Sequence, residues 1–310
     1  VEYYHVQGSG LLCFTFIMSQ NDNRTSESTL FVDHEDVRHC ISVLTTDTTT
    51  TSERDNALMQ LRAIFDKYLE CPSLLDANLE EIISCLTKSA RLQFHEKNSH
   101  TLSALYALSK VRGRKRIQRF FPHETRDVEP VFHALQNMTL NPSTSFDTGP
   151  QSWESAYVLW LWLEMLSLVP FDCAVLSSDA FVPSLIQMAK THLSLAGPVR
   201  ETAASCLASW LNRPDLNAEL DSFLEWSHDI LVQFQQSPAN KNVMLVIGVM
   251  ETLTRLLKCN TTNQMHFKME PLWKTALNIA ETNSTMILRK LFTKWFARMG
   301  CAYMPPRIAS

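Results

Sequence analysis

Glycine is the residue this sequence lacks most clearly, with only seven among 310 residues. That is roughly 2%, where about 7% is usual for globular proteins. Sandwiches, barrels and nucleotide-binding α/β folds need glycine in tight turns and phosphate loops. The scarcity therefore argues against these classes and favours an all-helical chain.

Motifs of the common enzyme classes are also missing. The sequence contains no GxxxxGK[ST], GxGxxG, HExxH or GxSxG pattern. Its eight cysteines are at least 14 residues apart, which rules out zinc-type spacing and predicts reduced, buried thiols. We therefore predict no catalytic residue, no cofactor and no metal ligand, and expect a protein that is not an enzyme.

No apolar run is long enough to cross a membrane. The longest block, Ala156–Val169, has 14 residues and is followed by Pro170, whereas a spanning helix needs about 20 residues. Trp153, Trp160 and Trp162 belong to the same predicted helix, and Trp160 and Trp162 point to opposite sides. This pattern predicts a helix that is buried on both sides.

The charge balance argues against a dedicated nucleic-acid binder, because the formal net charge is −4. One segment departs from this balance. Its six basic residues are Lys110, Arg112, Arg114, Lys115, Arg116 and Arg119. Such a local excess predicts a surface that binds an acidic protein partner. The alternative is an ordinary solvated helix face whose cations pair with neighbouring carboxylates.

The first part of the chain is polar and ends in the threonine-rich stretch Thr45–Ser52. Residues 1–52 are therefore expected to form a flexible leader, within which Cys40–Leu44 could fold as a short first helix. Residues 1–17 are expected to be an extension that is not native, because Met18 is followed by an ordinary polar N-terminal sequence.

From residue 53 to 310, apolar residues recur with helical spacing many times over. Val246, Val249, Met250 and Leu253 form one such stripe. About eleven helices with short breaks, a helix opening like that of a HEAT repeat at Gly197–Ala204, and irregular pair spacing predict an α-solenoid of HEAT/armadillo-like repeats. A compact irregular bundle is the alternative.

The expected breaks follow from local signals. Ser52 and Asp76 are predicted to be helix N-caps, because acidic first turns follow them. Residues 141–152 are expected to form an exposed loop between two groups of helices.

Several ordered blocks of sequence resemble one family. They are Lys110–Lys115, Arg119–Glu124, Asp127–Val131, Trp153-Glu154, Tyr157–Trp162, Leu168–Asp172, Asn212–Asp215, Phe223–Ser227 and Leu288–Leu291. Together they resemble the N-terminal part of the tubulin-folding cofactor D family, also called tubulin-specific chaperone D. The chain departs from the family pattern at Arg114, where an aromatic residue is usual, and at Ser155-Ala156, where Thr-Arg is usual.

This resemblance implies a HEAT-repeat scaffold that binds β-tubulin after the chaperonin step and supports αβ-tubulin assembly. It also implies work with tubulin cofactors C and E and an Arf-like small GTPase, and a part in stimulating GTP hydrolysis by tubulin. The implied location is the cytoplasm, with microtubule association as a further expectation. A generic HEAT scaffold, such as a transport adaptor, is the rival hypothesis.

Overall fold

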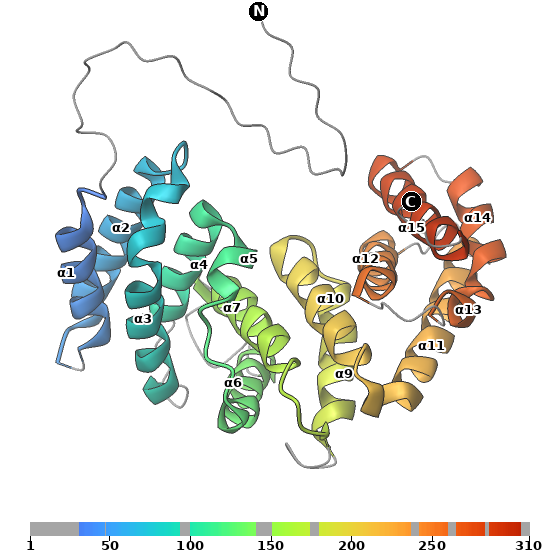
Figure 1. Ribbon diagram of the computed structural model, residues 1–310, viewed down its shortest axis with the longest axis horizontal. Coiled ribbons are helices and arrows are strands. Elements are labelled where there is room, and N and C mark those ends of the chain that lie inside the picture. Colours follow the sequence, from blue (N-terminus) through green and yellow to red (C-terminus); the bar gives the residue numbers. More distant parts are fainter. Residues whose placement is uncertain are drawn as a thin grey trace, which may run out of the picture.

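The computed structural model describes residues 31–46, 48–93, 100–140, 151–173, 180–236, 242–259, 265–282 and 285–304. All regular secondary structure in these ranges is helical. The described helices form six pairs that follow one another along a curve, each packed on the next (Figure 1). The predicted all-α solenoid is confirmed.

The inner layer of the curve contains the second helix of each pair. Its members are α2 (Thr51–Lys67), α4 (His100–Arg112), α7 (Gln151–Leu166), α10 (Pro198–Leu211), α12 (Val243–Cys259) and α15 (Met286–Tyr303). Each of these helices contacts the next member of the inner layer, which makes the layer continuous.

The outer layer contains the first helix of each pair. Its members are α1 (His34–Thr45), α3 (Leu79–Gln93), α6 (Val128–Leu140), α9 (Phe181–Leu193), α11 (Asn217–Gln236) and α14 (Leu272–Thr282). Short helices connect the layers: η1 (Pro72–Asn78), α5 (Arg114–Gln118), η2 (Thr125–Asp127), η3 (Pro214–Leu216) and α13 (Met265–Met269). None of the described helices combines the length and apolarity that crossing a membrane requires.

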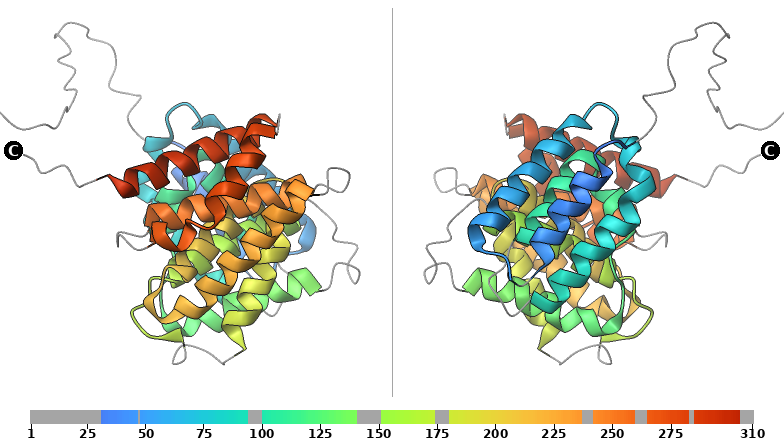
Figure 2. Two further views of the ribbon diagram at one scale, coloured as in Figure 1. Left: turned by 90° about the vertical axis from the view of Figure 1, so that its right-hand side faces the viewer. Right: turned by 90° about the vertical axis from the view of Figure 1, so that its left-hand side faces the viewer.

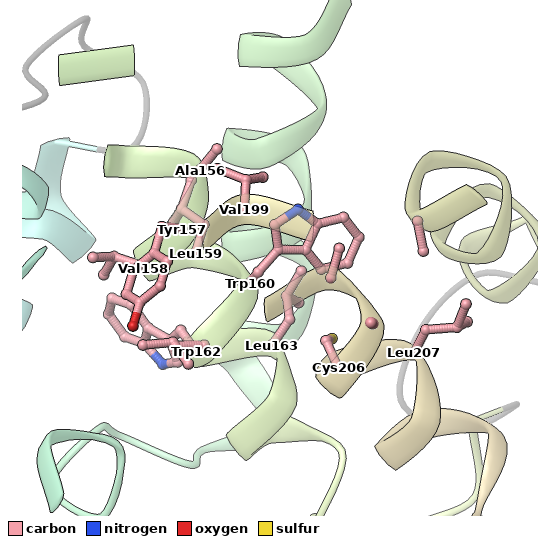
Figure 3. Packing of buried hydrophobic residues seen from close by; sticks show 14 of the residues in the cluster. Ala156, Tyr157, Val158, Leu159, Trp160, Trp162, Leu163, Val199, Cys206 and Leu207 are labelled. Atoms are coloured by element: carbon pink, nitrogen blue, oxygen red, sulfur yellow. The ribbon is translucent and has the colours of Figure 1, made fainter. Parts of the chain in front are cut away.

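Helix α7 lies at the centre of the core, and residues 154–163 are buried without exception. Trp160 and Trp162 point to opposite sides of it, as predicted (Figure 3). Trp160 lies edge-on to His192 of α9, while the Trp162 indole donates a 2.8 Å hydrogen bond to the Pro122 carbonyl. The exception is Trp153, which is 38% exposed at the start of the helix, so the prediction is wrong for this residue.

The expected leader is wrong for residues 34–45, because they form α1. Val37, Cys40, Ile41 and Leu44 lie on one face at helical spacing and are buried against the following helices. The apolar face outweighs the polar composition of this region, and the short helix expected around Cys40–Leu44 is real. Residues 1–30, including the expected extension 1–17, lie outside the described ranges.

Two predicted caps are wrong. The cap of α2 is Thr50, whose side chain accepts from the Glu53 amide while the Glu53 carboxylate accepts from the Thr50 amide. This reciprocal pair satisfies two amides at once, which Ser52 could not do one residue into the helix. Asp76 lies inside η1, where its carboxylate binds Arg112 instead of capping a helix.

Two other expectations need correction. Most of the loop predicted at 141–152 lies outside the described ranges, but Gln151 and Ser152 already belong to α7. The thiols are not uniformly buried. Cys40, Cys173 and Cys206 are buried, whereas Cys71, Cys85 and Cys301 are exposed.

Candidate protein-binding surface

The predicted basic segment is divided by a sharp backbone turn. Helix α4 ends at Arg112, α5 begins at Arg114, and Gly113 between them has φ = 90°. Glycine adopts this left-handed conformation without the steric cost that a side chain adds. The turn sets α5 apart from α4 on the inner side of the curve (Figure 1).

Contacts with α7 hold α5 in place. Ile117 is completely buried, and the Gln118 side-chain amide donates a 3.2 Å hydrogen bond to the Leu161 carbonyl. Just after α5, the ring of Phe121 lies 5.8 Å from that of Trp162. The basic segment is therefore fixed to the most enclosed helix of the core.

Carboxylates from preceding elements already pair with three of the six cations. Arg112 binds both oxygens of Asp76, and its hydrogen bond is the main reason that the pKa of Asp76 is lowered. Arg116 Nη2 lies 3.5 Å from the same carboxylate, and Lys110 Nζ lies 3.2 Å from Asp66. For these three residues, the geometry is that of a surface paired with neighbouring carboxylates.

The other three cations differ in exposure. Arg114 is half-buried. Burial lowers the pKa of Arg255 in α12, and the nearby charge of Arg114 lowers it further. Lys115 and Arg119 are exposed, and no carboxylate of the described ranges pairs with either. Lys115 and Arg119 are therefore the cations of this segment that are most accessible to a partner.

Polar groups also link helices of the inner layer. Ser205 of α10 donates a 2.7 Å hydrogen bond to Glu164 of α7 and accepts one of the same length from Arg255. Arg62 of α2 lies 2.5 Å from Glu154 of α7. The first set of contacts joins the neighbouring helices α7, α10 and α12, and the Arg62–Glu154 pair joins α2 to α7 past α4.

A second basic surface lies on α15, and the sequence reasoning missed it. Lys290 and Lys294 are exposed and Arg298 is half-buried, at four-residue spacing along this helix. The side chain of Arg298 donates to the Thr254 carbonyl of α12. A count of charges along the final predicted helix could have found this surface, since the helix has four basic and no acidic residues.

Within the described ranges, no group of three or more His, Cys, Asp or Glu side chains is placed to hold a metal. The prominent polar features there are instead ion pairs within the fold and exposed cations on its inner side. Chemically, such an arrangement is suited to binding another macromolecule through complementary charge.

Comparison with known proteins gives a consistent result. The model of the family "Tubulin-specific chaperone D-like, ARM repeat" matches residues 65–231, a little over half of the chain. Tubulin-specific chaperone D of Dictyostelium discoideum is 25% identical, with 80% of this chain and 24% of that protein aligned. The chain thus spans about a quarter of the length of this curated relative.

Among solved structures, an engineered protein resembles the chain with a TM-score of 0.47 and 12% identity. The aligned region covers 86% of this chain and 97% of the engineered protein.

Proposed function

This chain belongs to the tubulin-specific chaperone D-like ARM repeat family, and from that premise we propose that it is part of a tubulin chaperone that binds β-tubulin. The family match over residues 65–231 carries the proposal. The matched range includes α4, α5 and α7, which form the centre of the inner surface.

The proposed role is to hold β-tubulin after the chaperonin step, during assembly of the αβ-tubulin heterodimer. The binding partners proposed beside β-tubulin are tubulin cofactors C and E and an Arf-like small GTPase. With them, the complete protein would stimulate GTP hydrolysis by tubulin, and it would do so in the cytoplasm and at microtubules. A continuous curved surface supports a holding role, because solenoids use extended concave surfaces to bind proteins.

Within this proposal, the exposed cations of α5 contribute to recognition. Lys115 lies on α5 and Arg119 directly follows it, and α5 is fixed to α7 on the inner side of the curve (Figure 1). Charges held on a rigid element accelerate association with an oppositely charged protein and help to set its orientation.

In the direct test, the chain is immobilised and used to capture two forms of tubulin. One is purified αβ-tubulin, and the other is β-tubulin that chaperonin has already released. The test variant is Lys115→Glu with Arg119→Glu, which leaves the ion pairs of Asp76 intact. The matched control, Lys274→Glu with Arg289→Glu, reverses the same number of exposed charges near the other end. Circular dichroism establishes that both variants are folded.

We expect the wild-type chain and the control to retain β-tubulin, and the α5 variant to retain less at low salt. Because screening acts within about 10 Å at 0.1 M salt, the difference should shrink as salt is added. A wild-type chain that retains no tubulin, and instead captures vesicle-coat or transport proteins from extract, would favour the generic scaffold.

A further inference from the structure

Helix α15 carries a stripe of positive charge along one side. Lys290, Lys294 and Arg298 follow one another at intervals of four residues, which keeps side chains on one flank of a helix. Arg289 is the fourth basic residue of α15, and its angular position places it away from this flank. We define Lys290, Lys294 and Arg298 as the α15 stripe.

Lys290 and Lys294 of the α15 stripe are exposed to solvent, and the Arg298 end of the stripe contacts α12. Arg298 reaches across to the Thr254 carbonyl, which fixes one end of the stripe against α12. Burial lowers the pKa of Lys294, and the charges of Arg298, Arg255 and Lys290 lower it further.

Little negative charge compensates the three residues of the α15 stripe, whereas the charges of Glu164, Glu251 and Glu201 all act on Arg255. No carboxylate in the described part of the chain forms an ion pair with Lys290, Lys294 or Arg298. One carboxylate, Glu251, raises the pKa of Lys294. Its effect is smaller than the lowering caused by each neighbouring cation. The neighbouring cations repel one another in the free protein, and an anionic group placed among them would relieve that repulsion.

The stripe is also located where a partner could reach it. Figure 1 shows α15 and α5 on the inner side of the curve, on opposite sides of its opening, and Figure 2 shows α15 along the edge of the molecule. Successive cations are about 6 Å apart along the helix axis. Alternate residues of an extended polypeptide are about 6.6 Å apart, so carboxylates on such a segment match the spacing.

We propose that the α15 stripe is a docking surface for an acidic segment of a protein partner. The proposal does not require that the partner be tubulin. It commits to a polypeptide because the net charge of the chain is −4, which disfavours a nucleic acid over a locally acidic segment.

The experiment measures binding of a fluorescein-labelled peptide of alternating Glu and Gly by fluorescence anisotropy. The same peptide with Gln in place of Glu is the probe control. The test variant is Lys290→Gln with Lys294→Gln, which removes two exposed charges and leaves the Arg298 contact in place. Lys274→Gln with Arg289→Gln is the matched control, since it removes two exposed cations from α14 and the other flank of α15.

We expect the wild-type chain and the matched control to bind the acidic peptide equally, and the stripe variant to bind roughly tenfold more weakly at low salt. The Gln peptide should not bind. Equal affinity of the stripe variant and the wild type overturns the proposal. So does a thymidine oligonucleotide that binds more tightly than the acidic peptide and depends on the same lysines.

Capture of tubulin by the same variants keeps this proposal separate from the proposed function. If the wild type binds the acidic peptide through the α15 stripe but retains no tubulin, the docking surface is supported and the tubulin proposal fails. If tubulin is retained but the stripe variant binds the peptide normally, the docking surface is refuted alone.

Discussion

Arg213 and Asp215 form a two-point ion pair, with Arg213 Nε 3.0 Å from Asp215 Oδ1 and Nη2 3.2 Å from Oδ2. The same guanidinium donates to the carbonyls of Ser167 and Val169, each at 2.8 Å, and to that of Phe171. Asp215 in turn accepts from the Cys173 amide at 2.7 Å. One charged pair thus holds the segment that follows α7 onto the start of η3.

Replacing Arg213 with alanine is expected to destabilise the chain by roughly 2–4 kcal/mol, because three carbonyls and Asp215 lose a charged donor at a site with little solvent. The free energy of unfolding in urea measures this. The control is Arg126→Ala, which removes an exposed arginine and should change stability by no more than about 0.5 kcal/mol. A similar small loss for both variants would mean that the carbonyl contacts contribute little.

The pH dependence of stability should reveal the contribution that the ionised Asp215 carboxylate makes to the fold. Burial raises the pKa of this carboxyl, but hydrogen bonds from the Cys173 amide and Arg213 outweigh burial and bring it from 3.8 to about 2. A lowered folded-state pKa stabilises the fold above the unfolded pKa, and that stabilisation is lost as pH falls from near 4 toward 2. We expect the stability advantage of the wild type over Asp215→Asn to shrink by about 1–2 kcal/mol across this window.

Urea unfolding between pH 6 and the acid limit of the fold provides the measurement. Asp172→Asn, at an exposed neighbouring position, is the control and should follow the wild type throughout. If the difference between the wild type and Asp215→Asn stays constant down to about pH 3, Asp215 is not stabilised as its contacts indicate.

Truncation of Trp160 and truncation of Trp153, both in α7, should lower the free energy of unfolding by different amounts. Trp160 is completely buried, and its indole nitrogen has no hydrogen-bond partner in the described part of the chain, so its contribution comes from packing. Trp160→Ala should cost about 3–5 kcal/mol, the usual range for a core aromatic. Trp153→Ala, at a partly exposed site beside Tyr106, should cost about 1 kcal/mol in the same urea titration. Equal losses would contradict the difference in burial.

Helical periodicity predicted the solenoid well, because the apolar face of each helix is formed by residues only three or four positions apart in the sequence. The same rule applied to Val37, Cys40, Ile41 and Leu44 would have found α1, but the polar composition around them concealed it. Long-range pairing is different. Arg112 and Asp76 are 36 residues apart, and only the packing of η1 on α4 brings them together.

The same holds for the basic surfaces, where the positions of the charges can be predicted from the sequence but their distant ion-pair partners cannot. The density of cations from Lys110 to Arg119 is visible in the sequence. The pairing of Lys110 with Asp66, and of Arg112 and Arg116 with Asp76, is not. The α15 stripe differs, because its cations are four residues apart and do not form a dense run in the sequence. Their helical spacing is nevertheless visible there. Local charge density alone therefore identifies the first surface but neither its ion pairs nor the second surface.

The carboxylate of Asp76 limits how much positive charge α4 and α5 can offer a partner. It binds Arg112 through both oxygens and lies 3.5 Å from Arg116. Asp76→Asn keeps the shape of the side chain and its ability to accept one hydrogen bond, but it removes the negative charge. If α5 recognises an acidic face of tubulin, this variant should associate with tubulin about two- to fivefold faster at low salt, because net attraction rises with local charge.

Stopped-flow or biosensor association rates for tubulin test this expectation, which is opposite in sign to that for Lys115→Glu with Arg119→Glu. Asp221→Asn is the matched control, because it removes the exposed partner of Lys268 and changes the net charge equally. Asp76→Asn should also lose about 1–2 kcal/mol of stability, since the ion pair with Arg112 is partly shielded from solvent. A faster rate for both variants would indicate a response to net charge. An unchanged rate for Asp76→Asn would show that Arg112 and Arg116 serve the fold and not the partner.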